Sequence, residues 1–287
     1  MTIPDEVRTH CARVAASARS VRIDMDSLEA FEGAPQATID PIVEGSGDEI
    51  ARSLLILDAI NFGSGWFPTL RKRPGHSGYA TVAAALRERF GAEGPWSNEQ
   101  LRAIDTNTVA ATLGQSPDHE LMALYAQALR SLGSWLGGRD VLEAVAQARG
   151  SAATLASQLA GGMALFADHG FYKRAQIVPA NLALAGVASF GDLDALTIFA
   201  DNLVPHVLRC EGVLVYDERL AAHIDSGRLL RAGPQEHEIR ACAVHACELL
   251  GARLGVPARL LDNWLWNRGQ SPQYKALLRH RCRCVYY

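Results

Sequence analysis

Apolar side chains recur every three or four residues through most of this 287-residue chain, which is the spacing of amphipathic helices. The interruptions of the pattern by Pro and Gly separate one predicted helix from the next. The clearest predicted helices cover residues 7–21, 48–62, 79–90, 142–148, 153–166 and 234–254, and another follows Pro257. A short turn of helix is expected over 25–31, and a long helix that includes Met122 to Leu132 is expected to end near Gly137 and Gly138. Alternation typical of strands is confined to residues 212–216 and 283–287. The pattern therefore predicts an all-α protein with only minor extended segments.

The length is enough to bury a substantial core, either in one large domain or in two small ones. We expect a single, mostly helical domain over residues 1–287. Local signals place helix ends: Ser97 and Gln100 form a capping box, and Pro205 disturbs an intact helix, so a turn or a new helix is expected there.

Composition narrows the class of protein. Hydrophobic residues make up 48% of the chain, and the net charge is −3, which argues against a protein whose main task is to bind polyanions. A local basic run, Arg71 to Arg73, is read as solvated surface in preference to a phosphate site. No apolar run approaches the roughly 20 residues that span a bilayer. We expect no membrane association.

The six cysteines are scattered and no secretory signal precedes them, which fits reduced thiols in the cytoplasm. His280, Cys282 and Cys284 are the one tight group of metal-binding residue types. Zinc sites usually show two paired ligand clusters, so no metal is expected there, and no cofactor is expected elsewhere.

Asp201 interrupts an otherwise apolar run from Leu196 to Val204. An ionised carboxylate in such surroundings loses hydration and needs a partner. Asp201 is either a structural residue, which caps a helix or pairs with a cation, or a catalytic residue. Because Pro205 follows, Asp201 is expected near a helix terminus, where backbone N–H groups can hold its charge. Lys173, which follows an aromatic residue and precedes Arg174, is the second singular residue of this region.

A loop rich in Gly and Pro, residues 63–78, lies among the aromatic residues Phe62, Trp66 and Tyr79. Such a cluster either packs the core or offers flat faces on which a purine-like base stacks. Asn61 falls on the buried side of the preceding helix, as a satisfied helix-end amide or as a ligand contact.

For Asp262 and for the terminal residues, the sequence allows either a structural role or a role in binding the substrate. Asp262 is either a cap or salt-bridge partner, or it accepts two N–H bonds from a guanine-like edge. The terminal residues combine cations with hydroxyls, notably Arg281 and Tyr286, so the tail either binds phosphate or is merely pinned to the domain.

Several segments of the sequence resemble the queuosine salvage protein family. They are FYKRAQ (171–176), LTIFAD (196–201), LRCEGVLVYDERL (208–220), HEIRACAVHACELL (237–250), LLDNWLW (260–266), HRCRCVYY (280–287) and, earlier in the chain, LDAINFGSGWFP (57–68). No single segment defines a mechanism, but together they cover most of the chain in the same order as in the family.

The resemblance implies a nucleotide N-glycosylase that hydrolyses queuosine 5'-monophosphate to queuine and ribose 5-phosphate. It implies that Asp201 is the catalytic carboxylate and that Lys173 lines the same site. The expected substrate-binding residues are Asn61, Phe62, Trp66, Tyr79, His206, Asp262, Arg281 and Tyr286. One departure is Asn181, because the family often has an acidic residue at that position.

A helical protein with a catalytic Asp beside a Lys also resembles the helical DNA-repair glycosylases in fold and chemistry. Two other functions therefore remain to be considered. A glycosylase for DNA or RNA bases needs a polyanion-binding surface, which the acidic balance disfavours. A non-enzymatic helical carrier of nucleosides needs the pocket alone. We expect a monomer that takes a small nucleotide, forms no stable complex with nucleic acid, and forms no Schiff base through Lys173.

Overall fold

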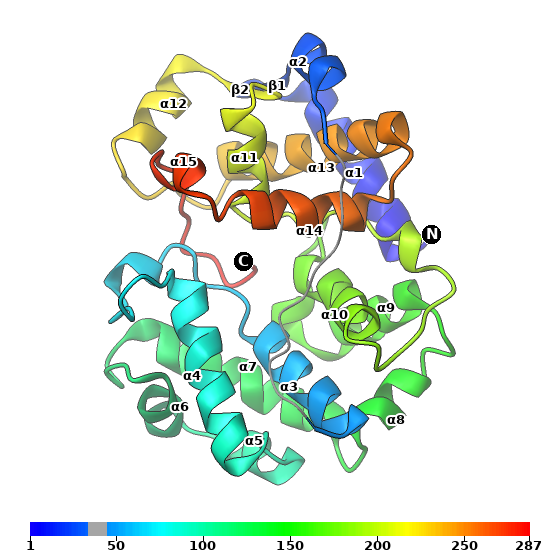
Figure 1. Ribbon diagram of the computed structural model, residues 1–287, viewed down its shortest axis with the longest axis vertical. Helices are drawn as coiled ribbons and strands as arrows, with labels where there is room; N and C mark the ends of the chain where they lie inside the picture. The colour runs from blue at the N-terminus through cyan, green and yellow to red at the C-terminus, as the bar shows by residue number, and fades with distance from the viewer. Residues whose placement is uncertain (34–44) are drawn as a thin grey trace.

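A computed structural model describes residues 1–33 and 45–287. Within these ranges the chain forms fifteen α-helices, three short 3-10 turns and one two-stranded antiparallel sheet (Figure 1). The all-α prediction is confirmed. Among the described residues, no helix is both long and apolar enough to cross a membrane.

The elements of the first half carry the labels of Figure 1. They are α1 (Ile3–Ser17), β1 (Val21–Ile23), α2 (Met25–Ala30), α3 (Gly47–Ala59), α4 (Gly78–Glu93), α5 (Asn98–Ala103), α6 (Thr106–Leu113), α7 (Glu120–Leu136), α8 (Val141–Ala146) and α9 (Ala152–Gly162). The 3-10 turns lie at Phe67–Thr69, Ala164–Phe166 and Leu193–Ala195.

The second half contains the longest helix. Its elements are α10 (Lys173–Leu184), α11 (Val204–Cys210), β2 (Leu214–Tyr216), α12 (Glu218–Asp225), α13 (Pro234–Leu254), α14 (Ala258–Arg268) and α15 (Pro272–Lys275).

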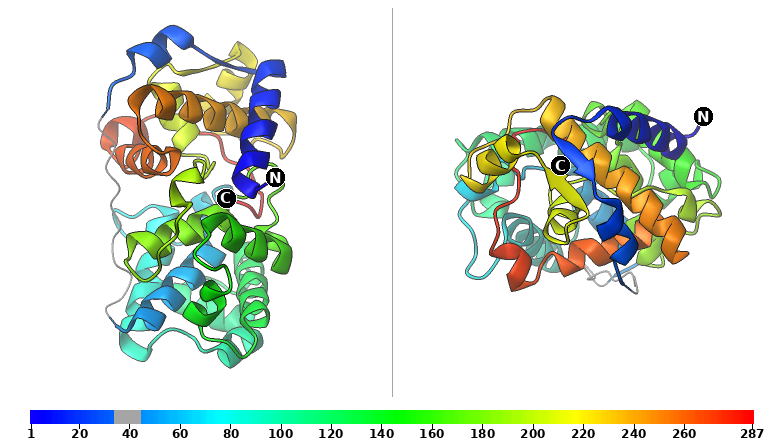
Figure 2. Two further views of the ribbon diagram at one scale, coloured as in Figure 1. Left: turned by 90° about the vertical axis from the view of Figure 1, so that its right-hand side faces the viewer. Right: turned by 90° about the horizontal axis from the view of Figure 1, so that it is seen from above.

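The helices form two groups (Figures 1 and 2). One group contains α3 to α10; the other contains α1, α2 and α11 to α15 with the small sheet, in which Val21 pairs with Tyr216. Buried apolar residues of both groups belong to one core cluster. That shared core supports the single-domain interpretation, which stays a prediction.

Helix ends follow the local signals of the sequence. Ser97 and Gln100 form the predicted capping box at the start of α5, and Pro205 lies in the first turn of α11. Prolines are tolerated there because the first helical N–H groups have no partner within the helix. Helix α3 ends at Ala59, so Asn61 lies beyond the helix and not on its buried face.

Two predicted segments differ from the structure. Val21 was expected to continue the first helix, but the helix ends at Ser17 and Val21 pairs in β1. A β-branched residue on a buried strand satisfies the same apolar spacing, so periodicity alone does not separate the two. The tail from Arg283 to Tyr287 contains no strand; its predecessor Cys282 forms an isolated bridge with Leu230.

The C-terminal tail lies between the two groups of helices (Figures 1 and 2). The backbone oxygen of Tyr287 accepts a hydrogen bond from Gly63 N at 3.0 Å. A Cβ at Gly65 would come within 2.5 Å of the Cys282 backbone, so only glycine permits this approach. The tail is thus tied to the loop of residues 63–78.

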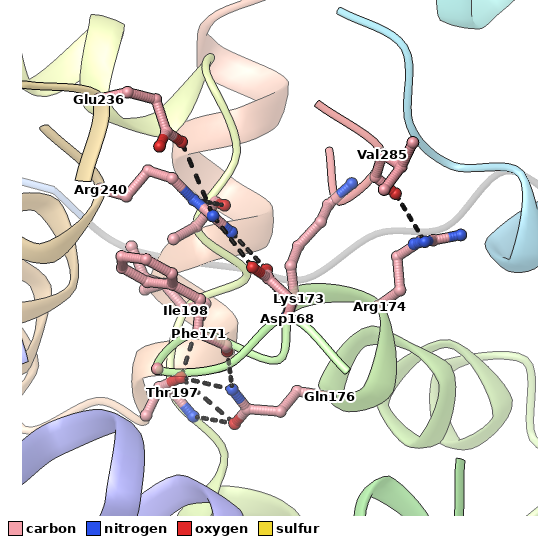
Figure 3. A network of polar contacts seen from close by, with 12 residues as sticks. Asp168, Phe171, Lys173, Arg174, Gln176, Thr197, Ile198, Glu236, Arg240 and Val285 are labelled. Carbon is pink, nitrogen blue, oxygen red and sulfur yellow. Dashed lines mark hydrogen bonds and ion pairs between the residues drawn. The ribbon is translucent and has the colours of Figure 1, made fainter. Parts of the chain in front are cut away.

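A buried ion pair joins α13 to the loop before α10 (Figure 3). The Arg240 guanidinium donates to both oxygens of Asp168, at 3.1 and 2.5 Å, and lies 3.7 Å from Glu236. It also stacks on Phe171 and Tyr287, with its central carbon 3.9 and 4.7 Å from the two ring centroids. Both partners of the pair are at most 5% exposed, so neither is solvated by water.

We predict that Arg240→Met destabilises the fold by about 3–5 kcal/mol, because it leaves the Asp168 carboxylate buried without its cation. Urea unfolding followed by circular dichroism measures the change. The matched control is Arg73→Met, which removes a solvent-exposed pair with Glu88 and is expected to change stability little. Equal, small effects of both substitutions would contradict this role for Arg240.

Candidate active site

The described residues enclose a cavity of about 460 Å³ and a smaller one of about 50 Å³. The larger cavity is lined from α3, α4 and α10 on one side and from α14 and the segment before α11 on the other. Seven residues line both cavities, which are therefore neighbours: Asn61, Ser77, Tyr79, Lys173, Asp201, Trp266 and Gln270. The two residues singled out by the sequence, Lys173 and Asp201, are among them.

Lys173 is the first residue of α10. Tyr172 before it has φ of 49°, a left-handed conformation that a non-glycine residue adopts at some energetic cost. Nζ of Lys173 donates to the backbone oxygen of Asn61 at 2.9 Å and to its Oδ1 at 3.1 Å. Asn61, just beyond the end of α3, therefore accepts both hydrogen bonds from Lys173 and also lines both cavities.

Burial lowers the pKa of Lys173 to about 8, and the negative charge of Asp201 opposes this shift. Desolvation disfavours the charged amine, whereas a nearby carboxylate favours it. At neutral pH the ammonium form predominates, and it is lost as the pH rises through 8.

Asp201 lies just before α11, as predicted from the position of Pro205. Its Oδ1 accepts hydrogen bonds from the N–H groups of Leu203 at 2.7 Å and Val204 at 3.0 Å. These bonds fix the carboxylate without neutralising it. Within the described residues its other oxygen makes no hydrogen bond, and the side chain lines both cavities.

Two further contacts hold the segment that carries Asp201. Gln176, on α10 just after Lys173, accepts from the backbone N–H of Thr197 at 3.1 Å and donates to its hydroxyl at 2.9 Å (Figure 3). Nε of Arg240 donates to the backbone oxygen of Ala200 at 3.0 Å. Both bonds end within four residues of Asp201, so α10 and α13 together set its position.

The ion pair between Arg240 and Asp168 also holds the backbone of Lys173 in place. Oδ2 of Asp168, which binds Arg240, lies 3.4 Å from the backbone nitrogen of Lys173 and accepts its N–H. Arg240 and Asp168 therefore link the backbone beside Asp201 to the start of the helix that carries Lys173. Sequence reasoning missed Asp168, although it lies only three residues before the FYKRAQ segment.

Asp262 projects from α14 into the larger cavity. Its Oδ1 accepts the N–H of Phe199 at 2.8 Å, and no hydrogen bond to the other oxygen is made by the described residues. Burial raises the pKa of Asp262 to about 7, and the charge of Asp201 adds to the shift. One turn along the helix, Trp266 meets Tyr79 edge to face with centroids 5.7 Å apart. This part of the cavity combines a carboxyl group with aromatic surface.

Asn181 lines the larger cavity from α10. Its amide nitrogen donates to both oxygens of Asp58, each at 3.0 Å. Burial raises the pKa of Asp58 to about 7. An acidic residue at position 181 would bring a second carboxyl group against Asp58, whereas Asn181 supplies donors to it.

Two predicted substrate contacts lie away from both cavities. Trp66 is buried, and its Nε1 donates to Glu120 at 2.7 Å, so its ring packs the structure. His206 is buried on α11 with Nε2 2.9 Å from the backbone oxygen of Tyr274. Phe62 lines the smaller cavity only, and its ring meets Tyr125 edge to face at 5.1 Å.

The tail contributes different residues from those predicted. Arg281 and Tyr286 do not line either cavity, whereas Arg279 and Tyr287 line the smaller one. The backbone oxygen of Arg281 accepts a hydrogen bond from Leu230 N, and this bond holds the tail beside the segment that follows α12. The last nine residues of the sequence contain three arginines, Arg279, Arg281 and Arg283, and spacing alone does not show which guanidinium faces a cavity.

Metal-binding residue types do not converge in the described residues. No three side chains of His, Cys, Asp or Glu gather there in a way that would hold a metal ion. Asp201, Lys173 and Asp262 are among the titratable groups that line the larger cavity.

The fold and the cavity define a helical protein with a cavity of small-molecule size, lined by a fixed carboxylate and a buried lysine. The chain belongs to the queuosine salvage protein family, whose model matches residues 43–287.

Named relatives support this assignment. A protein of Sphaerobacter thermophilus, queuosine 5'-phosphate N-glycosylase/hydrolase, is 32% identical over 98% of this chain and 97% of its own length. Proteins of the same name from Mus musculus and Dictyostelium discoideum are 35% and 34% identical, each over 41% of this chain and 40% of their own length.

We predict that Lys173 titrates with a midpoint near pH 8. The chain has three lysines, Lys72, Lys173 and Lys275, so ¹³C reductive methylation gives a simple NMR spectrum in which Lys173→Met identifies its signal. Asp201→Asn should lower the midpoint, because it removes the negative charge that favours the ammonium form. The control, Asp225→Asn, changes an exposed partner of Arg209 and should leave the midpoint unchanged. A midpoint near the ordinary lysine value of about 10.4 would contradict the burial argument.

Proposed function

We propose that this protein hydrolyses the N-glycosidic bond of queuosine 5'-monophosphate and releases queuine and ribose 5-phosphate. Family membership and the activity named for the relatives support the reaction class. The observation that carries the proposal is the position of Asp201: a carboxylate fixed by two backbone N–H groups, with its second oxygen not hydrogen-bonded by the described chain, in a cavity that it shares with Lys173.

Cleavage of the bond between C1' and the base nitrogen gives C1' oxocarbenium character. A fixed carboxylate that faces C1' interacts more strongly with this positive charge than with the neutral ground state, and that difference accelerates the reaction. Asp201 also orients the attacking water and takes its proton as the water oxygen bonds to C1'. The electron pair of the broken bond leaves with the base, which is then protonated.

Lys173 acts as a fixed cation in this proposal. Two of its donors are occupied by Asn61, so the ammonium is held in place and a third donor remains for a sugar or phosphate oxygen. A hydrolytic route needs no Schiff base. The leaving base is a 7-deazaguanine, which has carbon in place of N7, so its protonation takes place on the N3 or O6 side.

The base would occupy the larger cavity near α14. A carboxylate at Asp262 accepts two N–H bonds from a guanine-like edge, and its free oxygen is available for this. Tyr79 and Trp266 supply aromatic surface against which a flat base packs. The 460 Å³ volume lies within the range typical of small-molecule sites.

The proposal extends to how the protein works in the cell. We take it to act as a monomer on a free nucleotide, without a stable nucleic-acid partner, in the cytoplasm. All six cysteines are free thiols, as is usual in a reducing compartment.

We predict that Asp201→Asn lowers the rate of base release by at least about 100-fold while the nucleotide still binds, because the charge is needed chiefly in the transition state. Chromatography follows the release of queuine from queuosine 5'-monophosphate, and binding is measured by calorimetry. Asp225→Asn, which removes a charge from the surface helix α12, is the control and should retain full activity.

The other functions give different results in the same experiment. A nucleoside carrier binds the nucleotide in both forms and releases base in neither. A glycosylase for nucleic acid shows activity that falls steeply with salt. A Lys173 adduct trapped by borohydride would overturn the role given to this lysine.

A further inference from the structure

Helix α1 packs along α13, and a pair of histidines joins the two helices (Figures 1 and 2). Nε2 of His10 on α1 lies 2.6 Å from Nε2 of His237 on α13, and the two rings meet edge to face with centroids 4.9 Å apart. Both rings are partly exposed, so protons from solvent reach them. Two imidazole nitrogens this close share one proton, because one ring donates it and the other accepts it.

The neighbours of the pair determine which ring donates. Nη2 of Arg13 lies 3.3 Å from Nδ1 of His10, and a guanidinium only donates, so Nδ1 accepts. His10 then carries its proton on Nε2 and donates to Nε2 of His237, an assignment that follows from the network of bonds. Both rings are neutral in this arrangement. A proton on Nε2 of His237 removes the acceptor, and a proton on Nδ1 of His10 faces the Arg13 guanidinium.

Burial lowers the pKa of both rings, and positive neighbours add to this effect. Charged groups face the pair from α1, from α13 and from the loop before α10. Two are cations, which oppose protonation of the pair, and two are carboxylates, which favour it: Arg13, Arg240, Glu6 and Asp168. Because the pKa values of the folded protein lie below the ordinary histidine value of about 6.5, the stability supplied by the neutral pair is complete above that pH and is lost as the pH falls below it.

The pair lies against the loop that leads to Lys173. His10 covers Gly170 so closely that a Cβ there would come within 2.8 Å of the ring, and the φ of 86° at this position also favours glycine. The ring of Phe171 contacts both imidazoles, with its centroid 5.9 Å from that of His10 and 4.8 Å from that of His237. The two histidines therefore enclose the loop from the side of α1 and α13.

Two further contacts join α1 to this loop. Sγ of Cys11 donates to the backbone oxygen of Gly170 at 3.6 Å, and the hydroxyl of Tyr172 donates to Oε1 of Glu6 at 3.0 Å. Tyr172 is the residue in the left-handed conformation that immediately precedes Lys173. Helix α1 thus contacts each residue from 170 to 172, and its bond to α13 through the histidines keeps it in that position.

We propose that His10 and His237 are positioning residues for the active site: their hydrogen bond holds α1 against α13 and over residues 170–172, and protonation of the pair releases it. Release frees the loop from which α10 starts, so Lys173 loses its fixed position. The effect on activity rests on the proposed function, whereas the effect on structure does not. For each proton that only the released form binds, the equilibrium constant for release rises by up to about tenfold per pH unit below about pH 6.5.

The test compares wild type with His10→Gln and His237→Gln at about pH 7.5 and about pH 5.5, one unit on either side of the ordinary histidine value. Glutamine keeps a donor and an acceptor but does not titrate. Between the two pH values, we expect the rate of base release from queuosine 5'-monophosphate to fall about 3- to 10-fold more in wild type than in either variant. The urea midpoint of unfolding should also fall further in wild type.

Carboxyl groups of the site titrate in the same range, because burial raises the pKa of Asp58 and of Asp262 to about 7. They are unchanged in every variant, so only a difference between variants reports on the histidine pair. The control is His223→Gln on α12, where Nε2 of His223 lies 3.0 Å from the backbone oxygen of Leu229. It should show the pH dependence of wild type.

Two spectroscopic measurements are independent of activity. ¹⁵N NMR of the imidazole rings at about pH 7.5, one unit above the ordinary histidine value, should show His10 protonated on Nε2 and His237 protonated on Nδ1. The ¹³C signal of methylated Lys173 should move further between the two pH values in wild type than in the glutamine variants, which share the titration of Lys173 itself near pH 8.

The positioning role is wrong if His10 and His237 titrate independently near the ordinary value, or if the glutamine variants or His223→Gln fail to differ as described. If unfolding changes and the Lys173 signal does not, the pair is structural only, which also overturns the role. If wild type releases no base at either pH, yet the histidine-dependent changes in unfolding and in the Lys173 signal are present, the positioning role stands and the hydrolase proposal fails.

Discussion

The buried pair of Arg240 and Asp168 is the interaction on which the site depends. Two charges removed from water are tolerated only because they satisfy one another and their neighbours, and that requirement fixes their geometry. Arg240 reaches the backbone before Asp201, and Asp168 reaches the backbone of Lys173. A structural ion pair that touches no cavity thus sets the relative positions of the two residues proposed to act on the substrate.

Much of the fold could be predicted from sequence because its signals are local. Pro234 begins α13, and Leu254 ends it before a glycine, both as the pattern indicated. The predictions of secondary structure fail where the sequence pattern correctly indicates a buried residue but does not determine its backbone conformation. Val21 keeps its apolar position by entering a strand, and the tail keeps an extended course by binding the 63–78 loop and not a sheet.

The site was predictable only where one residue contradicted its surroundings. Asp201 was visible because a carboxylate within an apolar run needs compensation, and its expected partners, backbone N–H groups at a helix start, are present. Arg279 lacked such contrast, because it is one of several arginines near the end of the chain. Which guanidinium faces the cavity depends on the course of the tail between two groups of helices, and no local pattern encodes that course.

The cavity walls come from residues separated by more than two hundred positions, from Asn61 to Arg279, whereas each helix is stabilised within itself and by its neighbours. Contacts between distant parts of a chain carry the larger loop-closure cost and generally form late in folding. Helical content is therefore a poor measure of an assembled site. A preparation in which the tail has failed to dock between the two groups would retain most of its helices, and its far-ultraviolet spectrum would differ little from that of the native protein.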